Sequence, residues 1–106
     1  MMNLMGEATM ATYITLGNFT DQGIRNVKDT TKRAEAVKEA VRKSGANMKN
    51  IYWTMGSYDL IGIFEAPDDL SMSAVALAIG MAGNIRGQTL RALTADEMNG
   101  VLSKLP

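Results

Sequence analysis

The chain has 106 residues, 46% of them hydrophobic, and its 11 Lys and Arg residues balance its 11 Asp and Glu residues. This length predicts one domain with a modest core, and the zero net charge argues against a surface built to hold nucleic acid or an anionic membrane. The sequence contains no cysteine and no histidine, which excludes disulfides, thiolate chemistry and the commonest side chain for metal, haem and general-base roles. We therefore expect no metal site, and nothing in the sequence selects a cofactor.

The first ten residues lack the features of a targeting signal. They hold four methionines and no basic residue, and Asn3, Gly6 and Glu7 interrupt the apolar positions, unlike a signal peptide. We expect residues 1–9 to form a flexible leader and residues 10–106 to form a single domain. No apolar run approaches the roughly 20 residues that span a bilayer, so a cytoplasmic protein without a membrane partner is expected.

The first half of the domain predicts a strand followed by a helix. Residues 11–19 are β-branched and aromatic, which favours a strand. Residues 20–29 are polar and long for a connection, and we expect one irregular helical turn there. In residues 30–44, apolar positions recur at helical spacing, and Gly45 follows as a stop signal. This stretch predicts a helix.

The second half predicts a hairpin, a helix, a strand and a last helix. The elements are strands over residues 48–55 and 58–65, a helix over 70–81 and a strand over 85–93. Gly56-Ser57 separates the two hairpin strands, and Thr94-Ala-Asp-Glu97 is a capping box that opens the last helix. That helix presents the apolar residues Met98, Val101, Leu102 and Leu105.

The order β-α-β-β-α-β-α predicts an α+β fold. With right-handed crossovers it gives one antiparallel four-stranded sheet with its helices on one face, which is the ferredoxin-like plait, here with an added C-terminal helix.

A two-residue hairpin loop pairs Trp53 with Leu60 and Ile51 with Gly62, and strand alternation then divides the sheet into two apolar faces. The set that we expect beneath the helices is Ile14, Leu16, Tyr52, Ile61, Ile63 and Leu90. The set that we expect on the open face is Tyr13, Ile51, Trp53, Met55, Tyr58, Leu60 and Phe64, together with Gly17, Gly62 and Gly87. Such a face is too apolar for water. We therefore predict a homo-oligomer, with Tyr13, Ile51, Trp53, Leu60 and Phe64 in the interface.

Three segments resemble the GYD-domain family of small bacterial proteins: "TYITLGNFTDQGIRNVKDTTKRAEA", "YWTMGSYDLIGIFEAPDD" and "GNIRGQTLRALTADEM". The resemblance runs from about Met10 to about Met98. It implies a dimeric α/β-barrel, in which the open sheet faces of two plaits pack together, and it implies no established activity. The segment "TMGSYDL" is also similar to a hairpin in the ligand-sensing domain of Lrp/AsnC-type regulators. The chain lacks their helix-turn-helix, so DNA binding is not implied.

Gly56-Ser57-Tyr58-Asp59 has two interpretations. As structure, Gly56 supplies a positive φ at the turn, Asp59 accepts backbone hydrogen bonds and Tyr58 seals the sheet edge. As a site, Asp59 and the Tyr58 hydroxyl line the rim of a pocket between subunits. A lone Asp acts as a general base only if its pKa is shifted toward neutral.

Three further side chains are candidates for ligand binding, and each has a simpler structural alternative. Trp53 can stack on a planar ligand or pack in an interface. Arg25 can hold an anion at the start of the first long helix or lie in a solvated loop. Arg91 is a candidate buried charge that requires Asp59 or a ligand carboxylate as its partner.

The predicted helix over residues 70–81 is apolar on nearly all sides. We expect Leu70, Ala74, Leu77 and Met81 to face the sheet. Val75 and Ile79 then point outward, where they contact a further subunit in an assembly larger than a dimer, unless the last helix covers them.

Three functions fit the sequence. The leading hypothesis is a self-associating, non-enzymatic small domain that holds a small metabolite in a cavity between subunits. The first alternative is a cofactor-independent oxygenase or isomerase that uses Tyr58, Asp59, Trp53 and Arg91. The second is a purely structural assembly subunit.

Overall fold

The computed structural model describes residues 9–106 of the chain, so the predicted leader lies, apart from Thr9, outside the described residues. The elements are β1 (Ala11–Phe19), α1 (Asp21–Arg25), the 3-10 turn η1 (Val27–Asp29), α2 (Thr30–Lys43), β2 (Asn47–Trp53), β3 (Leu60–Ala66), α3 (Asp69–Met81), β4 (Ile85–Ala92) and α4 (Ala95–Leu102). Each predicted strand and helix for which limits were given is present within two residues of them, and the irregular turn in the first connection is α1 followed by η1.

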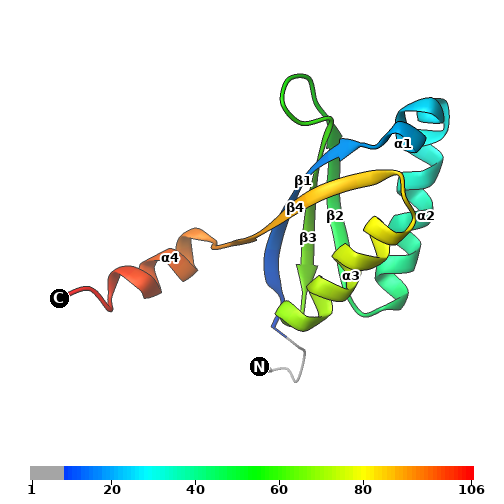
Figure 1. The fold of residues 1–106 in the computed structure, drawn as a ribbon. Helices are drawn as coiled ribbons and strands as arrows, with labels where there is room; N and C mark the ends of the chain where they lie inside the picture. Colours follow the sequence, from blue (N-terminus) through cyan, green and yellow to red (C-terminus); the bar gives the residue numbers. More distant parts are fainter. Residues whose placement is uncertain (1–8) are drawn as a thin grey trace.

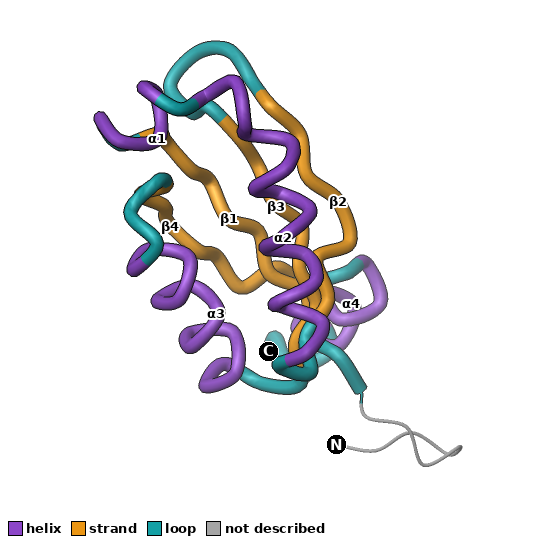
Figure 2. Tube along the Cα trace, turned by 90° about the vertical axis from the view of Figure 1, so that its right-hand side faces the viewer, coloured by secondary structure: helices purple, strands orange, loops and turns teal. Residues whose placement is uncertain are grey.

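The four strands form one antiparallel sheet in the order β2-β3-β1-β4. The helices α1, α2 and α3 lie on one side of this sheet (Figure 1), and α2 and α3 stand in front of it in the perpendicular view (Figure 2). The predicted α+β, ferredoxin-like plait is therefore confirmed. Within residues 9–106, no helix has the length and apolar character needed to cross a membrane.

The β2–β3 hairpin has the predicted register but a longer loop. Trp53 pairs with Leu60 and Ile51 with Gly62. β2 ends earlier and β3 begins later than expected, so residues 54–59 form the loop between them. In this loop Gly56 has a φ of 105°, a conformation that favours glycine. An even number of loop residues keeps the alternation of side chains, so the predicted parity of the hairpin holds.

The face assignment is wrong in one respect: the two faces are exchanged. Tyr13 and Phe64 are 4% and 3% exposed, and they lie in the core between the sheet and the helices, together with buried Leu60. Ile51 packs against the same core, and Trp53 shares its side of the sheet. Of the predicted interface residues of the sheet, Tyr13, Ile51, Leu60 and Phe64 therefore pack in or against the interior of the single chain, whereas Trp53 is 41% exposed.

The small size of the buried side chains of α2 explains why the two faces of the sheet are exchanged. The sheet side of α2 is buried at Ala34 and Val41, which are small, so large side chains from the sheet must fill the space between the layers. Phe64 does so, and it needs Gly62, where a methyl group would lie 2.7 Å from its ring.

The orientation of α3 is also the reverse of the expectation. Met72 and Val75 are buried in the core and Ile79 packs against it. Val75 and Ile79 are therefore not outward contacts. The side that faces away from the sheet carries the exposed residues Leu70, Ala74, Leu77 and Met81.

Local hydrogen bonds fix where the helices begin. The side chain of Asp68 accepts from the backbone N–H of Ser71 at 2.8 Å, which starts α3 and lowers the pKa of that carboxyl group. Thr20 caps α1 in the same way, and its hydroxyl also donates to the carbonyl of Gly83 at 2.5 Å. The short helix α1 is thereby held against the turn between α3 and β4.

Candidate functional site

The first candidate surface is the sheet face that the three helices leave uncovered. Strand alternation places six apolar side chains there, and we call this set the open face: Ile14, Leu16, Tyr52, Ile61, Ile63 and Leu90. Tyr52 and Leu90 are exposed and the other four are half-buried, whereas the residues on the helix side of β3 are buried. A contiguous apolar patch on a sheet is typical of a surface that binds another protein.

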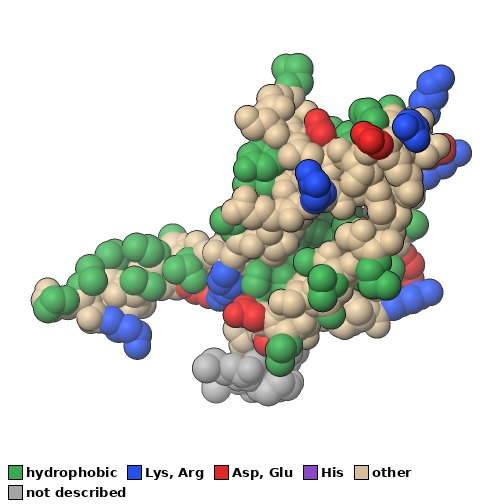
Figure 3. Space-filling model, in the orientation of Figure 1, with side chains coloured by type: hydrophobic (Ala, Val, Ile, Leu, Met, Phe, Trp, Pro, Cys, Tyr) green, Lys and Arg blue, Asp and Glu red, His purple; other side chains and the backbone are tan. Residues whose placement is uncertain are grey.

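The second candidate surface is the C-terminal arm, residues 93–106. Its helix α4 projects from the end of β4, on the side of the sheet opposite α2 and α3 (Figures 1 and 2). Figure 3 shows hydrophobic side chains along this helix. Those that are well exposed are Leu93, Met98, Val101, Leu102 and Leu105. The alternative in which the last helix covers α3 is therefore wrong within the chain.

The arm is anchored at its base by specific polar contacts. The predicted capping box is confirmed: the Thr94 side chain accepts from the N–H of Glu97 at 3.1 Å, and Glu97 accepts from the N–H of Thr94 at 3.0 Å. Arg91 of β4 donates to the other carboxylate oxygen of Glu97 at 2.9 Å. These two donors, first the Thr94 N–H and then Arg91, lower the pKa of Glu97. The contacts set the direction in which α4 leaves the sheet.

A chain of contacts continues from the arm into the core. The guanidinium of Arg91 lies 5.5 Å from the centre of the Tyr13 ring, within cation–π range. The Tyr13 hydroxyl donates to Asp69 in the first turn of α3 at 2.5 Å. Burial, reinforced by this hydrogen bond, raises the pKa of Tyr13 to about 12. The series Glu97–Arg91–Tyr13–Asp69 links α4, β4, β1 and α3.

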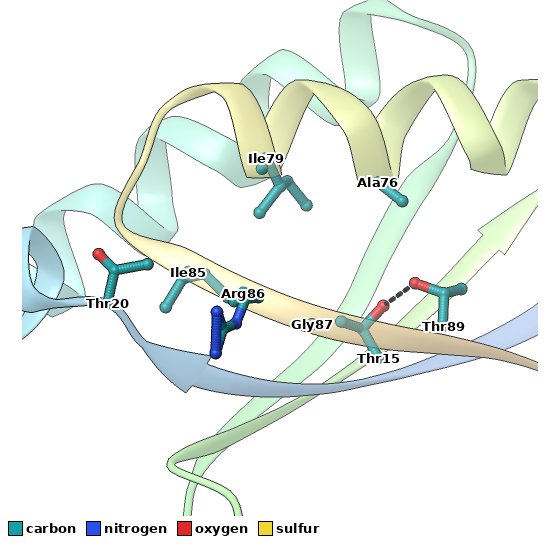
Figure 4. A pocket seen from close by; sticks show the side chains of 9 residues that line it. Thr15, Thr20, Ala76, Ile79, Ile85, Arg86, Gly87 and Thr89 are labelled. Carbon is teal, nitrogen blue, oxygen red and sulfur yellow. Dashed lines mark hydrogen bonds between the residues drawn. The ribbon is translucent and has the colours of Figure 1, made fainter.

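The third candidate is a hollow between α3 and β4, which we call the α3–β4 groove. It encloses about 270 Å³ and is lined by Thr15, Thr20, Ala76, Ile79, Gly80, Ile85, Arg86, Gly87 and Thr89. In Figure 4, Ile79 and Ala76 extend from α3 over the two strands, and the hydroxyls of Thr15 and Thr89 are joined by a 3.0 Å hydrogen bond. The hollow exists because β4 is an edge strand and small residues, Gly87 and Gly80, stand where larger side chains would fill it.

The Gly56–Asp59 segment makes structural contacts. The Asp59 carboxylate accepts from the backbone N–H of Phe19 at 2.9 Å, and its own N–H donates to the carbonyl of Gly17. Thr54 closes the loop with hydrogen bonds to the backbone carbonyls of Tyr58 and Asp59. Asp59 therefore ties the hairpin loop to the end of β1.

The remaining ligand candidates are dispersed. Trp53 donates from its indole nitrogen to Thr30 at the start of α2, and Arg25 is exposed in the last turn of α1. Arg91 is exposed and pairs with Glu97, so the expectation of a buried charge paired with Asp59 is wrong. Asp59 contacts the end of β1 that is far from Arg91 in the sheet register. Within one chain, the four side chains of the proposed oxygenase or isomerase do not meet.

Two features were missed from the sequence. The first is the Thr15–Thr89 pair. The antiparallel register of β1 and β4 places these two residues opposite each other on the helix side of the sheet, so the pair could have been predicted from that register. The close approach of Gly23 to the Asn84 backbone has no signal in the sequence beyond the glycine itself. Among the residues described, no group of three or more acidic, histidine or cysteine side chains is arranged to hold a metal ion.

The family assignment rests on nearly the whole domain. The model of the GYD domain matches residues 13–102, which include most of β1, the hairpin, the α3–β4 groove and α4. The chain belongs to the GYD-domain family. The resemblance seen in the sequence is thereby confirmed.

One relative of this GYD-domain protein has a descriptive name. It is the "Glutamine synthetase and cystathionine beta-lyase binding protein" of Thermus thermophilus, which is 28% identical over 90 residues, covering 84% of this chain and 95% of the relative. Its name describes binding to other proteins. No solved structure is significantly similar to the chain.

Proposed function

We propose that this GYD-domain protein is a self-associating binding domain that pairs with a second copy through its open face and binds partner proteins. The observation that carries the proposal is the apolar open face, which three helices leave uncovered while they bury the opposite side of the same sheet. The name of the Thermus relative supports the protein-binding part. The dimeric α/β-barrel is supported by the family resemblance and by the position of this face.

The energetics of the open face favour association. Fully burying one large aliphatic side chain stabilises by about 1.5–3 kcal/mol relative to leaving it in water. Four of the six side chains are already partly covered by their neighbours on the sheet, so each contributes less than that range. The sum nonetheless amounts to several kcal/mol before the entropic cost of association. Ile61 and Ile63 belong to a central strand, so they lie near the middle of the surface, where burial contributes most.

Sedimentation of the wild type and of Ile61→Lys tests the self-association. The substitution puts a charge in the middle of the open face without touching the core, so the wild type is expected to be dimeric at micromolar concentration and the variant monomeric with an unchanged circular dichroism spectrum. Ala36→Lys, on the exposed side of α2, is the control and is expected to remain dimeric. A wild type that stays monomeric at 100 micromolar would rule out the homodimer.

Binding of partner proteins is tested with purified enzymes. Glutamine synthetase and cystathionine beta-lyase of the same organism are immobilised, and the chain is passed over them with Ile61→Lys alongside. Saturable binding of the wild type to either enzyme supports the proposal. Absence of binding to both removes the argument that the relative supplies.

A second candidate function is binding of a small, uncharged metabolite, and the α3–β4 groove favours it. The Thr15 and Thr89 hydroxyls can each donate and accept a hydrogen bond, and Ala76, Ile79 and Ile85 supply aliphatic walls, with Arg86 as the charged lining residue. Native mass spectrometry of freshly purified protein measures any co-purified molecule. Thr89→Val keeps the shape of the side chain and removes the hydroxyl, and it is expected to release such a molecule.

A further inference from the structure

Two apolar surfaces of the chain lie on opposite sides of its sheet. The C-terminal arm extends from the open-face side, with Met98, Val101, Leu102 and Leu105 exposed. On the helix side, α3 exposes a stripe at helical spacing, with Leu77 at 70% exposure between Leu70 and Met81. The segment from Leu70 to Gly83 carries no charged side chain. Within one chain the edge strand β4 stands between these two surfaces.

We propose that the arm of one copy packs on the α3–β4 groove and the exposed stripe of α3 in a second copy, across the open-face dimer. This inference rests on the proposed self-association. In a dimer with two-fold symmetry the contact occurs twice, so each copy gives one arm and receives one.

The reach of the arm fits this arrangement. Packed sheets lie about 10 Å apart, and α4, with eight residues, is about 12 Å long. The link over residues 93–94 and the last four residues add to this length. An arm that starts at the level of its own sheet therefore passes the edge of the facing sheet and brings its last turn to the helix layer of the second copy.

The polarity of the two sheet edges indicates which edge of the second copy receives the arm. The edge at β2 carries a hollow lined by charged side chains, among them Glu35, Lys38 and Lys49. The edge at β4 offers the aliphatic walls of the α3–β4 groove, with Arg86 as its only charged lining residue. The exposed aliphatic residues of the arm match the second edge, because charged groups lose hydration when apolar side chains cover them.

The small size of the arm also indicates that the molecule it contacts is a second copy of this chain. A stable protein interface buries about 1,200–2,000 Å² in total, more than an eight-residue helix supplies alone. If the second copy covers the open face and also receives the arm, the two contacts form one continuous interface. The area of this combined interface can reach the size that a stable dimer needs. The Arg91–Glu97 ion pair and the capping box hold the arm in the required direction before the second copy binds.

Disulfide trapping tests the contact, and the chain suits it because it contains no cysteine. The double variant Leu102→Cys/Leu77→Cys joins the arm to the α3 stripe, and the matched control Leu102→Cys/Lys38→Cys joins it to the β2 edge. Both are oxidised under mild conditions, resolved by non-reducing electrophoresis and mapped by peptide mass spectrometry. The first variant is expected to give a covalent dimer linked between positions 102 and 77, and the control is expected to give less than one tenth of that yield.

The outcomes separate this inference from the proposed function. A dimeric wild type whose arm links to position 38 and not to position 77, or to neither, overturns the inference and leaves the open-face dimer standing. A 102–77 link within a single chain overturns it as well, because the arm then folds back on its own α3. A wild type that is monomeric by sedimentation overturns both. In the uncrosslinked protein, Val101→Lys/Leu102→Lys is expected to raise the dimer dissociation constant at least tenfold, and an unchanged constant would contradict the contact.

Discussion

The hydroxyl of Tyr13 donates a 2.5 Å hydrogen bond to the carboxylate of Asp69, 56 residues later, and so joins β1 to the first turn of α3. The ring of Tyr13 is buried while Asp69 is exposed. The pair fixes the start of α3 over the sheet, and it has a measurable dependence on pH.

Tyr13→Phe is expected to lower the free energy of unfolding by about 1 kcal/mol at pH 7, the usual net value of one hydrogen bond. The folded state raises the pKa of Tyr13 from 10.0 to about 12, so it holds the phenolic proton more tightly than the unfolded chain does. The contribution is therefore complete below pH 10 and is lost as the pH rises from 10 toward 12. Urea unfolding of both proteins at pH 7, 9 and 11 measures it. A difference between them that stays constant up to pH 11 would contradict the assignment.

Strand alternation correctly separated the two apolar sets of the sheet, apart from Met55 and Tyr58, which lie in the hairpin loop. The separation was possible because the register of the hairpin follows from the parity of its loop. It did not establish which set lies beneath the helices. Both sets are apolar, and α3 is apolar on nearly all sides, so neither layer identifies its inner face. The outcome depends on side-chain volume: the buried residues of α2, Ala34 and Val41, are small, and large side chains of the sheet such as Phe64 fill the core. Such complementarity between distant segments is not visible in local periodicity.

The ligand candidates were less predictable than the fold. Asp59 was correctly expected to accept a backbone hydrogen bond, since an Asp after a tight turn commonly does so. The predicted pairing of Arg91 with Asp59 was wrong. Arg91 pairs instead with Glu97, which lies six residues away across the link to α4. The direction of α4 depends on the Arg91–Glu97 contact together with the capping box, and only the capping box is visible as a local sequence motif.

Asp59 is expected to contribute to stability through its carboxylate. Asp59→Ala removes the acceptor for the Phe19 N–H and is expected to lower the free energy of unfolding by about 1–2 kcal/mol. Asp59→Asn keeps one acceptor oxygen in the same place and is expected to lose less than half of that. Thermal unfolding of the three proteins gives the comparison. Two variants with wild-type melting temperatures would show that the contact does not stabilise the fold.

The orientation of α3 is tested by a pair of lysine substitutions two residues apart. Val75 is 6% exposed in the core, whereas Leu77 is 70% exposed. Val75→Lys is expected to cost about 4 kcal/mol or more, because it buries an unpaired charge. With Ile61→Lys present in both variants to remove the proposed dimer, Leu77→Lys is expected to change the stability by less than about 0.5 kcal/mol. Circular dichroism at 25 °C with a urea titration measures both. If Leu77→Lys unfolds the protein and Val75→Lys does not, α3 has the opposite orientation.

Gly23 is expected to be irreplaceable because α1 packs directly on the turn between α3 and β4. A methyl group at Gly23 would lie 2.0 Å from the carbonyl oxygen of Asn84, a backbone atom that cannot rotate away. Gly23→Ala must push α1 outward and break the 3.1 Å hydrogen bond from the Thr20 N–H to that same oxygen.

The expected loss is about 2–4 kcal/mol, the sum of an overpacked contact and a broken hydrogen bond. Gly100→Ala is the matched control, since α4 has open space at that position. Alanine is favoured over glycine in a helix by about 1 kcal/mol, so this variant is expected to lose no stability. Differential scanning calorimetry of the two variants checks the contrast. Equal melting temperatures for Gly23→Ala and the wild type would mean that α1 does not pack on Asn84 in solution.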